Sequence, residues 1–225
     1  ANETAALKAA IRSNRTTMHG AVTASFLLTM RQRYGIDAMT VLSTIDLRRL
    51  SKPVLPQETY GCYIDILRTK NPISADFWDT ARDASFRLIS TLAKDQEPAS
   101  ILKLFDWEVY RQELGPLIAN HRRIDGLAVT TAGESGLRRD YGAFELEDVT
   151  MAVSLDLFGP SLFVVASERE GGMDISVGYA ADAVGDDEAA ALAEGAVALL
   201  TLKTGENIGA SGETAPQRTT DRQLN

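Results

Sequence analysis

The stretch 159-GPSLFVVASEREGGMDISVGYA-180 predicts two neighbouring β-strands and so assigns the C-terminal half of the chain to a sheet. In its second half, apolar residues at the odd positions from Met173 to Tyr179 alternate with polar or small residues at the even positions. This alternation is typical of a strand with one packed face and one wet face. Residues 161–168 form an apolar run, and the turn "EREGGM" joins the two segments. We therefore expect a hairpin here.

The segments on both sides of this hairpin add further strands and helices. After it, residues 186–205 begin with acidic residues and carry Lys203 near their end, which is the charge order that a helix dipole favours. Before it, strands are expected at 126–131 and 144–154. The apolar positions of 144–154 change parity near Glu147-Asp148, which predicts a bulge or a break at that point.

The N-terminal half predicts helices that flank two strands. In residues 18–34 apolar side chains recur every four positions, Thr16 or Thr17 can cap the helix, and Gly35 can end it. The other expected elements are a helix at 3–12, strands at 39–47 and 60–69, a helix after a Ser74 cap, and a helix at 107–114 that is broken near Gly115-Pro116.

This order of elements predicts an α+β fold class with a mixed, largely antiparallel sheet. We expect one lobe over residues 1–205 and a flexible polar tail at 206–225. The chain lacks an initiator methionine and its helical pattern begins almost at once, so we also expect it to start inside a longer polypeptide. No apolar run reaches the roughly 18 residues of a membrane span, and no signal pattern is seen. A cytoplasmic protein without a membrane span is the expectation.

Composition and charge disfavour several classes of function. The 225 residues carry a net charge of −8 and arginine pairs stand beside aspartates, so a nucleic acid is not an expected partner. The single cysteine, Cys62, excludes an intramolecular disulfide and lies in an apolar run, so we expect it to be buried and inert. The segment 130–136, "TTAGESG", has the wrong glycine spacing for a phosphate loop.

Two histidines, His19 and His121, are the candidates for a catalytic base or a metal ligand. Both stand apart from other good ligands, so a metal site is not expected, and no nucleophile-elbow pattern accompanies them. His19 falls in the first turn of an expected helix, where the positive helix end favours a neutral imidazole. That position suits a base, but it equally suits a packing residue. We favour the structural interpretation for both histidines.

Several segments, taken in order, resemble the C-terminal half of the condensation-domain superfamily of acyltransferases. This superfamily includes nonribosomal peptide condensation domains, alcohol acetyltransferases and polyketide-associated mycocerosyl transferases. The similarity covers residues 3 to 203. The matching segments are "TTMHGAVTASFLLTMRQRYG", "VLSTIDLRRL", "YGCYIDILRT", "DFWDTARDASFRLIS", "LAVTTAGESG", "YGAFELEDV" and "GPSLFVVASEREGGMDISVGY".

The resemblance implies one half of a two-lobed molecule. Each lobe of the family has a chloramphenicol acetyltransferase-like fold, here expected with its helices packed on one face of the sheet. A tunnel between the lobes brings an acyl thioester on CoA or on a carrier-protein phosphopantetheine to an alcohol or amine. The resemblance implies no permanently bound cofactor, because acyl-CoA or acyl-phosphopantetheine is the donor substrate.

The resemblance also implies that the catalytic base lies on another polypeptide segment. Acyl transfer requires a base that takes the proton of the nucleophile and donors that stabilise the oxyanion. In the family that base is a histidine of an HHxxxDG motif in the N-terminal lobe, and this sequence contains no such motif. His19 matches a helix-start position that serves packing in the family. We therefore assign no catalytic residue to this chain.

Four residues match family positions that line the tunnel. Asp65 stands where the family often has asparagine, in its "fvN" strand. Thr130, Thr131 and Gly133 stand at its "SNlG" position. By the resemblance, these four are candidate tunnel residues, although the changes from Asn to Asp and from Ser-Asn to Thr-Thr alter the available donors.

Two further residues match family motifs less directly. Arg48 in "IDLRR" stands at the arginine of the "pvdlR" strand, where an ion pair that stabilises the lobe and a contact to a substrate carboxylate or phosphate are both open. Asp156 in "DLFGP" partly matches the "DFGWG" motif, without the tryptophan and with Pro160 in place of the last glycine. We expect a structural role for Asp156.

Three hypotheses follow for the function of the chain. The first is the C-terminal lobe of a condensation-type acyltransferase, which is active with an N-terminal lobe that carries HHxxxDG and has an acyl carrier protein as a further candidate partner. The second is a noncatalytic binding or scaffold module that keeps this fold. The third is a homodimer in which a second copy replaces the missing lobe.

Overall fold

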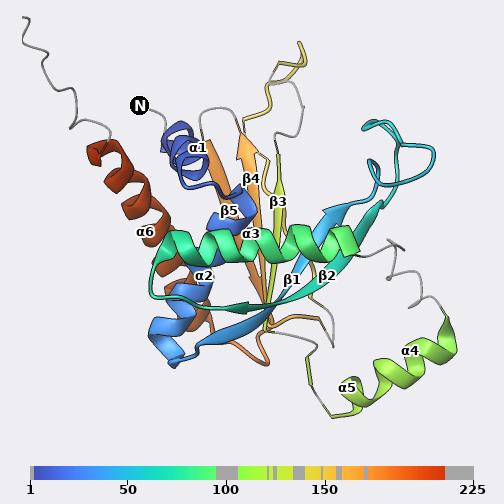
Figure 1. Cartoon of the computed structure of the whole chain (residues 1–225). Coiled ribbons are helices and arrows are strands. Elements are labelled where there is room, and N and C mark those ends of the chain that lie inside the picture. The colour runs from blue at the N-terminus through green and yellow to red at the C-terminus, as the bar shows by residue number, and fades with distance from the viewer. Residues whose placement is uncertain are drawn as a thin grey trace, which may run out of the picture.

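The computed structural model shows a sheet with helices packed on one side (Figure 1). It describes residues 3–94, 106–120, 122–123, 126–133, 140–147, 149–155, 159–169 and 172–210. The helices are α1 (Glu3–Ser13), α2 (Met18–Tyr34), α3 (Phe77–Lys94), α4 (Trp107–Glu113), α5 (Gly115–Ala119) and α6 (Asp186–Ala210). The strands are β1 (Ala38–Asp46), β2 (Ile64–Pro72), β3 (Leu127–Ala132), β4 (Leu162–Arg169) and β5 (Gly172–Tyr179).

The five strands lie in the order β2-β1-β3-β4-β5. The pairs β1–β2 and β4–β5 are antiparallel, whereas β1–β3 and β3–β4 are parallel. The expected hairpin is confirmed, with Leu162 opposite Tyr179. Because β1, β3 and β4 run in the same direction, their carboxyl ends meet at one edge of the sheet. The amino end of antiparallel β2 reaches that same edge.

The helices cover one face of the sheet, and the core lies between them. The register aligns Val41, Leu127 and Leu162 across three strands, and none of the three is more than 2% exposed. They belong to one buried cluster with Phe26 of α2 and Leu192 of α6. Helices α1, α2, α3 and α6 lie on this face, and α4 and α5 lie apart from them (Figure 1). The expected packing of helices on one face is confirmed.

Helix α2 is the central helix of that layer, and its ends follow the sequence signals. The hydroxyl of Thr17 accepts a hydrogen bond from the Gly20 N–H at 3.0 Å, so Thr17 is the cap. Gly35 ends the helix with a left-handed φ of 68°. Unlike an amphipathic surface helix, α2 has buried residues around most of its circumference, because the sheet, α3 and α6 all pack on it.

Two helix ends differ from the sequence prediction. The Asp76 carboxylate, rather than the Ser74 hydroxyl, caps α3, since its Oδ1 accepts the Asp79 N–H at 2.8 Å. The Ser74 hydroxyl precedes this cap in the sequence and accepts the Asp76 N–H. Helix α6 continues past Gly205 to Ala210. Gly205 lies inside the helix and does not adopt the left-handed conformation of a C-terminal cap.

The expected strand at 144–154 is wrong for this chain. Within the described parts of this segment, the structure shows one isolated bridge, between Asp140 and Glu145, and no strand. The apolar side chains Val149, Met151 and Val153 are each 39% exposed, and the residues between them are exposed as well. A strand also needs a ladder of hydrogen bonds to a neighbouring strand, and the described residues 149–155 are not part of a strand.

Among the described residues, no helix has the length and apolar character needed to cross a membrane. The sequence-predicted residues His121 and Asp156 lie outside the described residues, as does segment 211–225 of the expected tail.

Candidate functional site

The candidate site is the sheet edge at which the carboxyl ends of the parallel strands meet. Ligands of open α/β sheets bind outside this kind of edge. Arg48 follows β1, and Asp65 is the second residue of β2. Thr130 and Thr131 lie near the end of β3, and Gly133 comes directly after that strand. The structure therefore brings all five sequence-predicted tunnel candidates to one edge. Whether they contact a substrate stays a prediction.

The five candidates do not share one face at this edge. Asp65 is fully buried on the helix-covered face, and its Oδ1 accepts the N–H of Ile66 at 2.8 Å. Thr131 has the same parity as the buried residues Leu127 and Val129, so it lies on the helix-covered face as well. Asp65 and Thr131 are thus screened from the open face of the sheet.

Thr130 and Gly133 are the candidates that are reachable from the open face. The hydroxyl of Thr44 on β1 donates to the hydroxyl of Thr130 on β3. This pair places hydroxyl groups on two inner strands of the sheet, near the carboxyl ends of these strands. Gly133 is exposed, and an added Cβ would meet nothing within 4 Å. Sequence comparison missed Thr44, because only the register of β1 against β3 shows that the two threonines are neighbours.

Arg48 holds the long loop between β1 and β2. One of its terminal nitrogens donates to the Asp46 carboxylate at 3.1 Å, and the other lies 3.2 Å from the carbonyl oxygens of Thr59 and Gly61. Its guanidinium also lies over the ring of Tyr63, 4.9 Å from the ring centre. The ion pair that we left open for Arg48 is therefore present.

Replacing Arg48 with glutamine should loosen this loop without unfolding the lobe. The guanidinium bonds span the loop from its start to its end, and a glutamine amide cannot reproduce the fork. We expect faster amide hydrogen exchange at Leu55, whose N–H donates to the Arg48 carbonyl, and a loss of about 1–2 kcal/mol in unfolding free energy. Substituting the neighbouring exposed Arg49 in the same way is the control, and unchanged exchange in Arg48→Gln would contradict this role.

His19 is a buried packing residue on the helix-covered side of the sheet. Its Nε2 lies 2.9 Å from the hydroxyl of Ser43 on β1, and the residue is 8% exposed. Burial lowers the pKa of His19 from 6.5 to about 4, so the imidazole is neutral near neutral pH. The contact with Ser43 places His19 on the helix-covered face. This location agrees with the structural interpretation drawn from the sequence.

Two other features bear on the chemistry of the site. The expectation of a buried cysteine is wrong, because Cys62 is exposed in the β1–β2 loop, before the first residue of β2. Among the described residues, no cluster of three or more histidine, cysteine or acidic side chains could hold a metal ion.

The family described as phthiocerol/phthiodiolone dimycocerosyl transferase C-terminus matches residues 1–186. The chain belongs to this family. The match covers α1 to β5, so it includes the whole sheet edge described above. The resemblance drawn from the sequence segments is confirmed by it.

Solved structures confirm the fold of this transferase C-terminal lobe. A polyketide synthase associated protein 5 from Mycobacterium tuberculosis matches with a TM-score of 0.61 and 18% identity, over 91% of this chain and 49% of the other. The EpoB cyclization-docking bidomain from Sorangium cellulosum gives 0.65 and 16%, over 90% and 39%. A PapA2 acyl transferase gives 0.58 and 14%, over 90% and 42%. Comparison with curated proteins finds no match.

The transferase lobe thus spans less than half the length of each of these solved structures. At these identities the likeness shows the fold, which is a condensation-type, chloramphenicol acetyltransferase-like lobe. The expected α+β class with a mixed sheet is confirmed.

Proposed function

We propose that this chain is the C-terminal lobe of a cytoplasmic acyltransferase. The complete enzyme moves an acyl group from a thioester of CoA or of a carrier-protein phosphopantetheine to a hydroxyl or amine. The observation that carries this proposal is the family match over residues 1–186 in a chain that spans 39 to 49% of solved two-lobed relatives. No permanently bound cofactor is needed for this reaction, because the acyl donor is a substrate.

Within the described residues, the histidine of this lobe is not suited to act as the base that the reaction needs. A general base works best with a pKa near the operating pH and within hydrogen-bond reach of the proton it removes. His19 fails on both counts, because it is buried against Ser43 and its pKa is lowered to about 4. The other histidine, His121, is followed by two arginines rather than by an HHxxxDG pattern. The base is therefore proposed to come from an N-terminal lobe.

The open side of the sheet supports the proposal of a partner lobe. Segment 149–155 crosses this side next to β5, since the Val153 carbonyl oxygen would lie 3.2 Å from a Cβ added to Gly178. Its side chains Val149, Met151 and Val153 are exposed at every second position. Because its apolar side chains are exposed and it belongs to no described strand, this segment fits a surface that a partner lobe covers. Thr44 and Thr130 would then face the space between the lobes.

The experiment is to combine this chain with an N-terminal lobe that carries HHxxxDG. We expect acyl transfer from an acyl-CoA to an alcohol by the mixture and by neither lobe alone. Exchanging the motif histidine of that lobe for alanine should abolish the reaction while the two lobes still associate. Acyl transfer by the isolated chain would contradict the assignment.

A pair of substitutions tests where the lobes meet. Met151→Asp places a charge on the open side, and we expect it to weaken association of the lobes by about tenfold or more. Phe86→Asp is the matched control, because Phe86 is 69% exposed on α3, on the helix-covered side. An equal effect of both changes would contradict the proposed interface.

A noncatalytic binding or scaffold module is the alternative. The missing HHxxxDG motif is the observation that favours it. A full-length gene product that also lacks this motif would support the alternative, and sedimentation analysis would show whether a second copy replaces the N-terminal lobe.

A further inference from the structure

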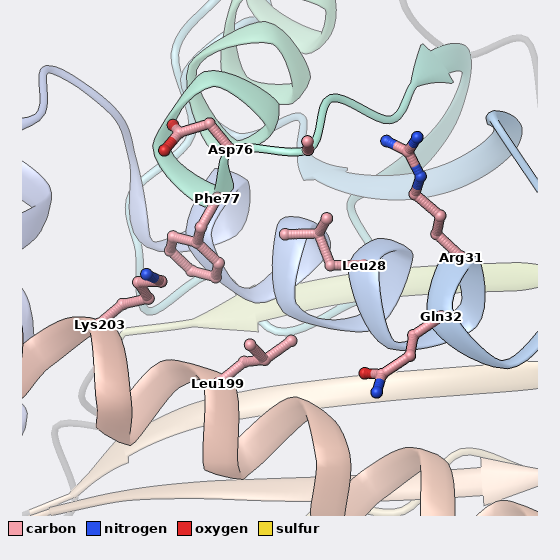
Figure 2. Close-up of a pocket in the computed structure, with 8 residues that line it drawn as sticks. Leu28, Arg31, Gln32, Asp76, Phe77, Leu199 and Lys203 are labelled. Atoms are coloured by element: carbon pink, nitrogen blue, oxygen red, sulfur yellow. The ribbon is translucent and has the colours of Figure 1, made fainter.

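A groove lies among three helices, on the side of the sheet opposite to the open face. Figure 2 shows it between α2, the start of α3, and α6. Its volume is about 470 Å³, which is within the range of small-molecule pockets. The lining residues are Leu28, Arg31, Gln32, Ala75, Asp76, Phe77, Leu199 and Lys203.

The floor of the groove is apolar and its ends are polar. Leu28 of α2 and Leu199 of α6 line the groove, Leu199 points from α6 toward α2, and the ring of Phe77 lies beside them (Figure 2). Arg31 and Gln32 stand at one end, and Lys203 stands at the other end, on the side of Asp76 (Figure 2). A hydrocarbon body would be removed from water by this floor, while a charged head would remain at an end.

The end with Arg31 is the one prepared for an anionic head. One Arg31 terminal nitrogen donates to the Ile73 carbonyl at 2.6 Å, and the other lies 3.3 Å from the Asp37 carboxylate. The Asp37 side chain is 83% exposed, so water weakens this ion pair. A guanidinium has five N–H donors in a planar fork, so further donors remain for a ligand after these two contacts. The backbone contact fixes the orientation of the side chain in advance.

The opposite end of the groove holds Lys203. Lys203 shares it with Asp76, whose carboxylate already accepts the Asp79 N–H as the cap of α3. We expect an anionic head beside Arg31, because the Ile73 carbonyl already fixes the orientation of its guanidinium. This asymmetry sets one orientation for a ligand in the groove.

We propose that this groove binds a small amphipathic carboxylate. Its hydrocarbon body lies on Leu28, Phe77 and Leu199, and its carboxylate accepts a hydrogen bond from the Arg31 guanidinium. The site is separate from the proposed acyl-transfer site, because it lies across the sheet from Thr130. Binding at this groove does not depend on the proposed function.

The test is titration of the full chain with octanoate, followed by amide chemical shifts and by calorimetry. We expect saturable binding at one site with a Kd at or below about 1 mM, and shifts on α2 and α6. Octan-1-ol, which has the same chain without the charge, should bind about tenfold more weakly, as expected for loss of a charge-assisted hydrogen bond. No saturation, equal affinity for the alcohol, or shifts confined to the open face would overturn the proposal.

Three substitutions locate the ligand and its orientation. Arg31→Gln should weaken octanoate binding by about tenfold, and Lys203→Gln, the matched change at the opposite end, should weaken it by less than about threefold. Leu199→Trp fills the floor of the groove and should abolish binding. This variant tests the site independently of Arg31→Gln, which removes a contact to the Ile73 carbonyl and can lower stability. Equal effects of the two charge changes, or octanoate binding unchanged by Leu199→Trp, would contradict the site. A groove closed to octanoate because the chain dimerises through it would also overturn the proposal.

Discussion

Replacing Gly20 with alanine should lower the unfolding free energy by about 3 kcal/mol, which is the upper part of the range for an overpacked core. A Cβ at this position would lie 2.1 Å from the Ser85 hydroxyl, 2.4 Å from the Ala81 carbonyl oxygen and 2.7 Å from the Thr16 hydroxyl. The hydroxyls can rotate, but the carbonyl belongs to the backbone of α3. The helices must therefore separate to admit a methyl group. Urea unfolding of the variant and of the parent chain would measure the difference.

The contacts around Gly20 explain why the separation would be costly. Thr16 donates to the Ala81 carbonyl at 2.8 Å, and the Ser85 hydroxyl lies within 2.9 Å of the hydroxyls of both Thr16 and Thr17. Moving α3 away from α2 would strain these bonds together. Buried polar groups that lose a partner cost more than the bond contributed.

A second glycine provides the control for this prediction. Gly205 lies inside α6, and an added Cβ there would meet nothing within 4 Å. Gly205→Ala should stabilise the chain by up to about 1 kcal/mol, since alanine favours a helix more than glycine does. If both substitutions had the same sign, helix propensity rather than the close approach of α2 and α3 would govern Gly20.

The sequence predicted local elements well because local residues decide them. Thr17 and Gly35 bound α2 through contacts within a few residues, and the alternation in 173–179 marks β5 whatever it pairs with. The end of α6 and the cap of α3 each lie a few residues from the position that the sequence predicted. At the start of α3 two suitable residues, Ser74 and Asp76, compete, and only the folded chain shows which of them caps the helix.

The arrangement of the site could not be predicted in the same way. The resemblance made Asp65 and Thr130 candidates for lining a tunnel, and the structure brings both to one edge of the sheet. It did not show that they lie on opposite faces, because a face depends on the register between strands that are distant in the sequence. The strand expected at 144–154 fails for a related reason. Its pattern is local, but a strand is completed by a partner.

His19 is the residue through which acid should destabilise this lobe most strongly. Its pKa is lowered by burial to about 4, from 6.5 for a solvated imidazole. Between these two pH values the unfolded chain binds a proton that the folded chain excludes, so the unfolding free energy decreases as the pH falls. The contribution of His19 is fully present above about pH 6.5. By about pH 4 the loss should reach about 3 kcal/mol.

Exchange of His19 for glutamine separates this contribution from the titration of surface carboxylates. Glutamine can still hydrogen-bond to the Ser43 hydroxyl, but it has no proton to gain, so stability of the variant should depend less on pH below about 6.5. At about pH 5 the two proteins should differ by about 2 kcal/mol in their change of unfolding free energy from about pH 7. An NMR titration of the folded chain supplies a second test, because the ring signals of His19 should not shift until well below pH 6.5. A ring that titrates near its solvated value would show that the contact with Ser43 opens to water, and His19 would then again be a candidate for chemistry.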